Sequence, residues 1–278
     1  MASLIWKEKP RPASLEKSWA GLLSLFKEMG SVMVAFSGGV DSGLLSAAAY
    51  QALGEKMLAV VVRSPVESAG DVESARSLSR QVGFPLRVVD YNDLQNPLFV
   101  SNPVDRCYTC KLNRFLLMKK MAEVEELVFL VEGSNKDDLD DYRPGMKAVL
   151  ETGTRSPLVE LDLSKVEIRE LARCLGLMVW DRPSQPCLAT RFPYGNPITQ
   201  AGLQQVAKGE AFLQNLGYKS VRVRHHGLLA KLEVDPQMIE KLAGQREEIE
   251  NFFRELGFTH TAVDLKGYRS GSLNEDIP

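Results

Sequence analysis

Residues 32–42 read VMVAFSGGVDS, and this stretch decides the fold. The apolar run Val32 to Phe36 ends at glycines, which is typical of a buried strand in a parallel sheet. Gly38 and Gly39 allow a tight backbone turn and the close approach of a ligand. A Leu- and Ala-rich helix follows, and its N-terminus presents N–H groups and a positive dipole end to the turn. The stretch therefore predicts an anion-binding loop, without the GKS or GKT of a Walker A loop.

The same alternation of strands and helices continues on both sides of this loop. Further strands are expected at 57–63, 85–91 and 127–133, and helices at 15–28, 41–53, 68–82, 111–124 and 165–175. Ser164 and Glu167 have the spacing of a capping box at the start of the last of these helices. Strands alternating with helices of roughly 10–15 residues predict an α/β domain around a parallel sheet. Ligands bind such sheets beyond the carboxyl ends of the strands, where SGGVDS, Arg63 and EGSNKDD (residues 132–138) all fall.

A second, smaller domain is expected after a proline-rich stretch. Pro183, Pro186, Pro193 and Pro197 mark a connector or a functional loop. Beyond them the pattern predicts helices at 199–216 and 235–256 and strands at 221–225, 229–234 and 259–265. We therefore expect two domains, residues 1–184 and residues 185–278, the second with an α+β fold and a frayed tail after Gly267.

Composition narrows the classes of function. The chain has 278 residues, 44% of them hydrophobic, and a net charge of −2, which disfavours a broad nucleic-acid footprint. No run of about 18 apolar residues occurs, and the N-terminus has no apolar core of a signal peptide, so neither a membrane nor export is expected. The predicted location is the cytosol, where paired cysteines more often bind metal or do chemistry than form structural disulfides.

Four motifs together point to a known family. SGGVDS and EGSNKDD resemble the signature of the PP-loop ATP pyrophosphatase superfamily, whose members split ATP into AMP and pyrophosphate. With PCLATRFPYG (residues 186–195) and VRVRHHG (residues 221–227), nearly the whole chain resembles the LarE family of ATP-dependent sulfur transferases. Those enzymes act in the nickel-pincer nucleotide pathway for lactate racemase. Their substrate is pyridinium-3,5-biscarboxylic acid mononucleotide, of which a carboxylate is adenylated and then converted to a thiocarboxylate.

The resemblance implies a set of ligands and site residues. It implies ATP and Mg²⁺, a homo-oligomer (a trimer or hexamer), and residues 185–278 as the part for substrate binding or oligomerisation. The nucleotide-binding residues would be Ala35, Ser37, Gly38, Gly39, Val40, Asp41, Ser42, Arg63, Gly133 and Ser134. The catalytic residues would be Asp41, Cys187, Glu210, Arg222 and Arg224. In well-known members, the cysteine matched by Cys187 gives up its sulfur and becomes dehydroalanine.

The chain departs from those members at DRCYTCK (residues 105–111), which contains Cys107 and Cys110. Other LarE-like proteins carry such a pair together with the PCLATR cysteine. The resemblance to them implies a [4Fe-4S] cluster on Cys107, Cys110 and Cys187, whose open iron could bind an extra sulfide. Structural zinc would need a fourth ligand, and a thioredoxin-type pair would directly follow a strand. A disulfide or redox pair, a zinc site and no joint role remain alternatives. Cys174 is expected to be a small buried core residue.

The VRVRHHG strand suggests how an anion would be bound. Alternation places Arg222 and Arg224 on one face, where two guanidinium groups can clamp a phosphate, with His225 and His226 extending the positive charge. The alternative is a solvated strand face with Glu210 as an ion-pair partner.

Other functions compete with sulfur transfer. An iron–sulfur-dependent transfer-RNA thiolase would conflict with the acidic balance, and an amide-forming ligase would need a glutaminase domain for which the chain has no room. A non-catalytic iron–sulfur or nucleotide sensor would not need the intact SGGVDS.

Overall fold

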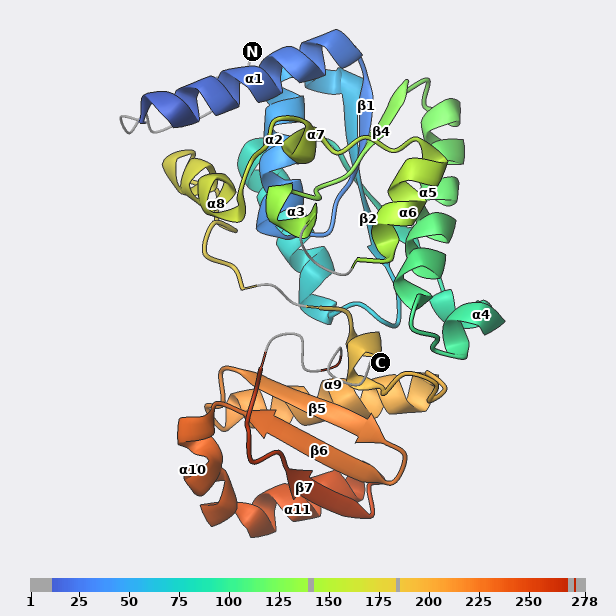
Figure 1. Cartoon of the computed structure of the whole chain (residues 1–278), viewed down its shortest axis with the longest axis vertical. Coiled ribbons are helices and arrows are strands. Elements are labelled where there is room, and N and C mark those ends of the chain that lie inside the picture. Colours follow the sequence, from blue (N-terminus) through green and yellow to red (C-terminus); the bar gives the residue numbers. More distant parts are fainter. Residues whose placement is uncertain (1–11, 140–142, 184–185, 270–272, 274–278) are drawn as a thin grey trace. The chain divides into compact units, whose positions relative to one another are not determined.

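The computed structural model describes residues 12–139, 143–183, 186–269 and 273, and they divide into two compact units (Figure 1). The first unit comprises residues 1–64, 69–91 and 107–185. The second comprises residues 65–68, 92–106 and 186–278, so it takes up two short segments that precede the proline-rich stretch.

The first unit is built on a parallel sheet with the strand order β3-β2-β1-β4. Its strands are β1 (Val32–Ala35), β2 (Met57–Arg63), β3 (Leu86–Asp90) and β4 (Phe129–Val131). Its helices are α1 (Ala13–Met29), α2 (Val40–Leu53), η1 (Gly54–Lys56), α3 (Ala69–Val82), α5 (Arg106–Val124), η3 (Lys136–Leu139), α6 (Gly145–Thr152), α7 (Pro157–Glu160) and α8 (Lys165–Cys174). The predicted α/β class with a parallel sheet is confirmed.

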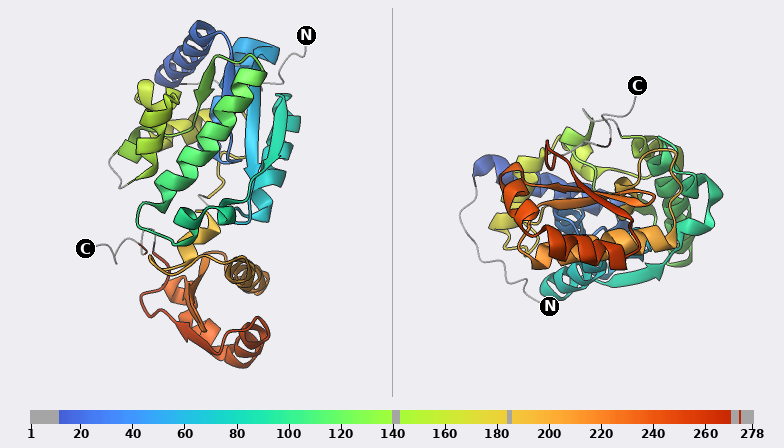
Figure 2. Two further views of the ribbon diagram at one scale, coloured as in Figure 1. Left: turned by 90° about the vertical axis from the view of Figure 1, so that its right-hand side faces the viewer. Right: turned by 90° about the horizontal axis from the view of Figure 1, so that it is seen from below.

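Helices cover both faces of this sheet (Figures 1 and 2). On one face, α1, α2, α3 and α8 enclose a core that includes Phe26, Leu44 and Leu78. On the other, α5 and α6 pack Phe115 and Val149 against the sheet. Burial on both faces explains why the strands are continuous apolar runs rather than alternating ones.

Helix α2 is the centre of the first core. Every residue from Ser42 to Ala49 is buried. Small side chains allow neighbouring helices to approach closely, and a Cβ added at Gly43 would lie 2.8 Å from a Leu78 methyl carbon. Because α2 is enclosed, the loop at its N-terminus is held by a rigid element.

The second unit is a small α+β fold with the strand order β5-β6-β7. β5 (Val221–His226) pairs antiparallel with β6 (Leu229–Val234), which pairs parallel with β7 (His260–Val263). Helices α9 (Gln200–Asn215) and α11 (Arg246–Glu255) lie side by side along one face of the sheet (Figure 2). The remaining elements are η2 (Asp93–Gln95), α4 (Pro97–Val100), η4 (Leu188–Arg191), η5 (Pro236–Met238) and α10 (Ile239–Gly244).

Two helix predictions were wrong in detail. The helix predicted at 235–256 is broken between α10 and α11, where Gly244 weakens the helix and the Gln245 side chain accepts a hydrogen bond from the buried Tyr218 at 2.6 Å. The helix predicted from Lys111 already begins at Arg106, so Cys107 and Cys110 lie in its first turn.

Two smaller expectations concern a cysteine and the chain end. Cys174, predicted to be buried, is half-buried at the end of α8. The expected frayed tail lies mostly outside the described residues. Among the helices described, none combines the length and the apolar character needed to span a membrane.

Candidate active site

The loop between β1 and α2 forms a polar cradle at the carboxyl edge of the parallel sheet. Gly39 caps α2 without a side-chain hydrogen bond, so the N–H groups of the first turn have no capping side chain of their own. Ser42 Oγ accepts a hydrogen bond from Ser37 N at 3.1 Å and lies 3.0 Å from Ser37 Oγ. These contacts close the loop and leave a helix N-terminus suited to a phosphate.

Gly38 fixes the orientation of this loop. Its φ is +76°, and a Cβ there would lie 2.7 Å from the carbonyl oxygen of Asp71. Its own carbonyl accepts hydrogen bonds from Arg182 Nη1 at 2.6 Å and Ser74 Oγ at 3.1 Å. Arg182 Nη2 also pairs with Asp71 at 2.7 Å, in a largely buried contact. The hydrogen bonds from Arg182 and Ser74 therefore fix the orientation of the peptide between Gly38 and Gly39.

Asp41 lies in the first turn of α2 and binds two side chains from later in the chain. Lys165, the first residue of α8, forms an ion pair with Asp41 Oδ2, and Asn135 Nδ2 donates to Oδ1 at 3.2 Å. Burial raises the pKa of Asp138, and the nearby negative charge of Asp41 acts in the same direction. The ion pair of Asp138 with Arg143, at 2.8 Å, opposes this shift without cancelling it. Two carboxylates and cationic side chains thus meet at the cradle.

The EGSN segment after β4 packs directly on the cradle. A Cβ on Gly133 would lie 2.9 Å from Ser42 N, so only glycine fits this close approach. The buried Glu132 accepts hydrogen bonds from Ser134 N, Ser134 Oγ and Ser156 Oγ and pairs with Lys111 at 3.1 Å. Burial alone raises the pKa of Glu132, but Lys111 and the serine hydroxyls outweigh it and hold that pKa below its usual value.

The other predicted nucleotide residues occupy the same edge of the sheet. Ala35 is the last residue of β1 and Val40 is the first of α2. Arg63 ends β2 and pairs through Nη2 with Asp90 Oδ2 at 2.7 Å, and the side chains of both are largely exposed. Arg63 therefore lies where the parallel strands end, with its side chain accessible to solvent.

The cysteine pair lies at the start of α5. Cys107 is exposed and Cys110 is half-buried, three residues apart on a helix and therefore on one face. Cys187 is half-buried and belongs to the second unit. Within the described residues, no three His, Cys, Asp or Glu side chains come together as a metal-binding group.

In the second unit, Cys187 precedes η4, and Arg191 ends it. Arg191 forms a bidentate ion pair with Glu210, with distances of 2.8 Å (Nε to Oε1) and 2.9 Å (Nη2 to Oε2), and both side chains are buried. Glu210 Oε1 also accepts a hydrogen bond from Val223 N at 3.1 Å. Glu210 is thus paired with Arg191, not with the strand arginines, and the alternative of a solvated face with Glu210 as partner is wrong.

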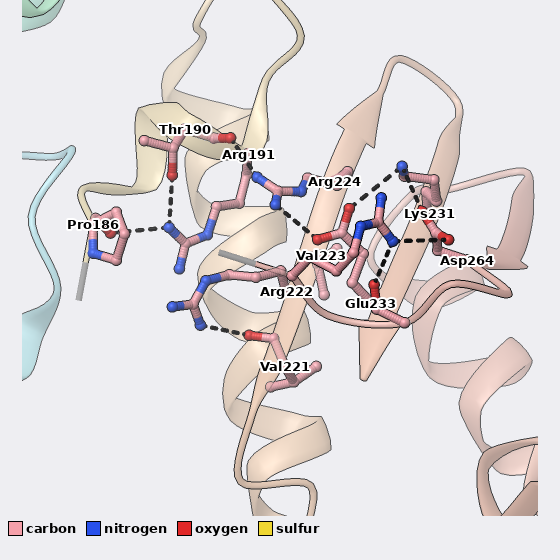
Figure 3. A network of polar contacts seen from close by, with 12 residues as sticks. Pro186, Thr190, Arg191, Val221, Arg222, Val223, Arg224, Lys231, Glu233 and Asp264 are labelled. Atoms are coloured by element: carbon pink, nitrogen blue, oxygen red, sulfur yellow. Dashed lines mark hydrogen bonds and ion pairs between the residues drawn. The ribbon is translucent and has the colours of Figure 1, made fainter. Parts of the chain in front are cut away.

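The two arginines of β5 differ in their partners (Figure 3). Arg224 is buried, pairs with Glu233 at 2.7 Å and donates to the Thr190 carbonyl at 2.7 Å. Arg222 is half-buried, donates to the Val221 carbonyl and stacks over the Tyr268 ring, and has no carboxylate partner among the residues that the structure describes. Burial, followed by the charge of Arg191, lowers the pKa of Arg222.

His225 does not extend this positive patch as predicted. Its ring stacks on Phe192 with centroids 4.8 Å apart and lies 3.0 Å from Gln205 Oε1. Burial lowers the pKa of His225, so the ring is neutral near pH 7. Strand alternation, which brings Arg222 and Arg224 to one face, sends His225 to the other.

The structure also adds residues that sequence reasoning missed: Lys165, Asn135 and Asp138 at Asp41, Arg182 at Gly38, and Arg191 at Glu210. Asn135 and Asp138 lie inside the quoted EGSNKDD motif, and that motif was the available signal for them. Lys165 and Arg182 come from distant segments without a local pattern.

Comparisons with known proteins agree with this geometry. The family model described as NAD synthase matches residues 23–102, which contain the cradle. An uncharacterized protein of Synechocystis sp. is 40% identical over 94% of this chain and 98% of its own length. Pyridinium-3,5-bisthiocarboxylic acid mononucleotide synthase of Lactiplantibacillus plantarum is 33% identical over 95% of this chain and 96% of its own. A component of the glutamine-hydrolyzing GMP synthase of Archaeoglobus fulgidus is 25% identical over 60% of this chain and 56% of its own.

Fold, cradle and matches together define an enzyme of the ATP-using PP-loop class. Within that class, the similarity to the Lactiplantibacillus synthase extends through both units. The chain belongs to the family of pyridinium-3,5-bisthiocarboxylic acid mononucleotide synthase, the LarE family.

Proposed function

We propose that this protein is an ATP-dependent sulfur transferase. It adenylates a carboxylate of pyridinium-3,5-biscarboxylic acid mononucleotide, releasing pyrophosphate, and converts it to a thiocarboxylate, releasing AMP. The observation that carries the proposal is the glycine cradle before the uncapped N-terminus of α2. Its support is the similarity over 95% of the chain to a synthase named for a bisthiocarboxylic product.

The cradle fits ATP and Mg²⁺. Gly38, Gly39 and the first turn of α2 offer backbone donors to phosphate oxygens. Asp41 and Asp138, which pair with Lys165 and Arg143, would supply the hard oxygen ligands that Mg²⁺ prefers. The ion, when bound, neutralises charge on the leaving pyrophosphate. The Lys165 ammonium at Asp41 adds positive charge at the same turn.

Strand β5, which carries Arg222 and Arg224, fits an anionic substrate. A cation that is partly desolvated and has no carboxylate partner binds an anion at a smaller net desolvation cost than a paired one. Arg222 meets that description, and a mononucleotide carries the phosphate that a guanidinium binds bidentately. Arg224 is committed to Glu233 and Thr190, so we assign it the role of holding the strand against the loop of Cys187.

Sulfur could arrive by two routes, of which we favour the second. In the first, the Cys187 thiolate attacks the acyl-adenylate and AMP leaves; loss of the Cα proton to a base and cleavage of the Cβ–S bond then yield thiocarboxylate and dehydroalanine. In the second, Cys107, Cys110 and Cys187 would hold a [4Fe-4S] cluster that supplies an extra sulfide. The support for it is the donor set: three thiols, two of them one helical turn apart.

The first experiment tests the enzyme. Purified protein with ATP, Mg²⁺ and the pyridinium mononucleotide should form AMP, pyrophosphate and a product heavier by exchange of oxygen for sulfur. The Asp41→Ala variant is the matched control and should form AMP and pyrophosphate about 10²-fold more slowly. Absence of AMP and pyrophosphate with wild type would refute the proposal, and turnover with transfer RNA in place of the mononucleotide would point to a thiolase instead.

The second experiment decides the sulfur source. Protein purified anaerobically should contain about four irons with labile sulfide, and Cys107→Ala should lose them. An active, iron-free wild type whose Cys187 loses the mass of H₂S, as its conversion to dehydroalanine requires, would establish the first route. A trimer or hexamer also stays a prediction, which light scattering on the same samples would check.

A further inference from the structure

The Arg191 side chain contacts the backbone on both sides of Cys187. Arg191 Nη1 donates to the Pro186 carbonyl at 2.9 Å and to Thr190 Oγ1 at 2.8 Å (Figure 3). It also donates to the Cys187 carbonyl at 3.3 Å. The Pro186 carbonyl belongs to the peptide before the Cys187 Cα and the Cys187 carbonyl to the peptide after it.

These two peptide planes set φ and ψ of Cys187. Arg191 therefore contributes to the direction of its Cα–Cβ bond. Thr190 Oγ1 contributes as well, since it donates to the Cys187 carbonyl at 2.9 Å. So does the backbone hydrogen bond from Leu188 N to the Val66 carbonyl at 2.7 Å.

Arg191 is in turn fixed by Glu210. The bidentate pair uses Nε and Nη2, which leaves Nη1 for the loop. Both side chains are buried, with 3% of Arg191 and 7% of Glu210 exposed. Glu210 comes from α9 and is also bonded to the β5 backbone at Val223, so the pair rests on the core of the second unit.

Both carboxylate oxygens of Glu210 are occupied by hydrogen bonds, and this changes the role that Glu210 can have. Its two oxygens accept hydrogen bonds from Arg191 Nε, Arg191 Nη2 and Val223 N. A carboxylate whose two oxygens are both engaged by a bidentate guanidinium, and one of them also by a backbone amide, is poorly placed to take a proton from a substrate. Its contact with the sulfur chemistry runs through Arg191 and the loop.

We infer that Arg191 is a positioning residue for Cys187 and that Glu210 acts through Arg191 rather than as a catalytic group. The inference rests on the proposed function in one respect, the importance of Cys187. A donor cysteine and a cluster ligand both need a defined direction of the Sγ atom, since a misplacement of about 1 Å can cost roughly 10²-fold in rate. Arg191 serves either route.

The rival explanation is an ordinary core ion pair, which affects stability alone. A labelling experiment separates the positioning role from the purely structural one. Cys187 is alkylated with iodoacetamide at several pH values, below the unfolding temperature, and the rate is measured by peptide mass spectrometry. The labelling uses iron-free protein, because a cluster would block Cys107 and Cys187 alike. The exposed Cys107 is then the internal reference in each sample. Arg191→Met should raise the Cys187 rate about tenfold relative to Cys107, because hydrogen bonds from a charged donor no longer hold the loop.

Two further variants keep the test decisive. Glu210→Gln should raise the Cys187 rate by a smaller factor, and Arg191→Lys should fall between wild type and Arg191→Met, because an ammonium cannot serve Glu210 and both carbonyls at once. Lys231→Met, which breaks the ion pairs of Lys231 with Glu233 and Asp264, is the matched control and should leave the rate unchanged.

An unchanged Cys187 rate and pH profile in folded Arg191→Met would overturn the inference. If that variant unfolds, Cys107 and Cys187 will react at equal rates, and Glu210→Gln and Arg191→Lys then decide by the same criterion. The assay needs neither ATP nor substrate. Wild type that forms no AMP but shows Arg191-dependent labelling would therefore refute the proposed function and leave this inference standing.

Discussion

The two proposed anion sites differ in the donors that they offer. The loop before α2 presents backbone N–H groups, whereas β5 in the second unit presents side-chain charge. The cradle depends on shape: Gly38 and Gly133 are positions where a Cβ would collide with backbone. The site at β5 depends on charge balance: Arg224, and Arg191 from the neighbouring η4, are neutralised by Glu233 and Glu210, whereas Arg222 has no carboxylate partner within the described part of the chain. Glycine substitutions should therefore damage the first site, and changes of charge the second.

The largest expected effect contrasts the two arginines of β5. Arg224→Met leaves the buried Glu233 with Lys231 as its remaining cation and should lower the free energy of unfolding by about 3 kcal/mol. Arg222→Met removes a half-buried cation that has no carboxylate partner among the described residues, and should leave stability within about 1 kcal/mol of wild type. Urea unfolding measures both, and equal losses would contradict the difference in pairing.

The next effect tests charge at the cradle. Asp41→Ala should reduce AMP and pyrophosphate formation about 10²-fold, because a fixed group at the phosphate site is lost. Glu55→Ala, an exposed carboxylate beyond the other end of α2, is the matched control and should retain wild-type rates. Steady-state release of pyrophosphate is the measurement, and an active Asp41→Ala would remove Asp41 from the site.

A smaller effect tests shape. Gly38 and Gly30 share a φ of +76°, but a Cβ at Gly38 would lie 2.7 Å from a carbonyl oxygen, whereas nothing lies within 4 Å of one at Gly30. Gly30→Ala should cost about 1 kcal/mol from its backbone conformation alone, and Gly38→Ala about 2 kcal/mol together with weaker ATP binding. Thermal unfolding and ATP titration check this, and identical behaviour of the two variants would argue against a tight cradle.

The smallest effect is the pH dependence of stability that comes from Glu132. Its pKa is lower in the folded than in the unfolded chain, so its contribution is present above the unfolded pKa and is lost as pH falls through the folded one. In the Glu132→Gln variant, the free energy of unfolding should therefore fall less steeply than in wild type as the pH drops below about 4.5. Urea unfolding between pH 3 and 7 measures this, and parallel curves for variant and wild type would refute the assignment.

Much of the fold followed from local pattern. Val32 to Ala35 and Met57 to Arg63 are strands as expected, because burial on both faces leaves a continuous apolar run. The capping box of Ser164 and Glu167 also formed as predicted. The early start of α5 was missed, although Asp105 before Arg106 is a residue type that favours helix starts. The break at Gln245 depends on Tyr218, which no local pattern reveals.

The sequence by itself determined the parallel sheet, the glycine cradle and the motifs that mark the family, because each is a local pattern of apolarity, glycine or charge. Only the tertiary structure decided which charges meet: Lys165 with Asp41, Arg182 with Gly38, and Arg191 rather than Arg222 with Glu210. Such pairings join residues from distant parts of the chain. The packing of helices and strands selects them, and it also placed the His225 ring against Phe192 and Gln205 instead of beside the strand arginines.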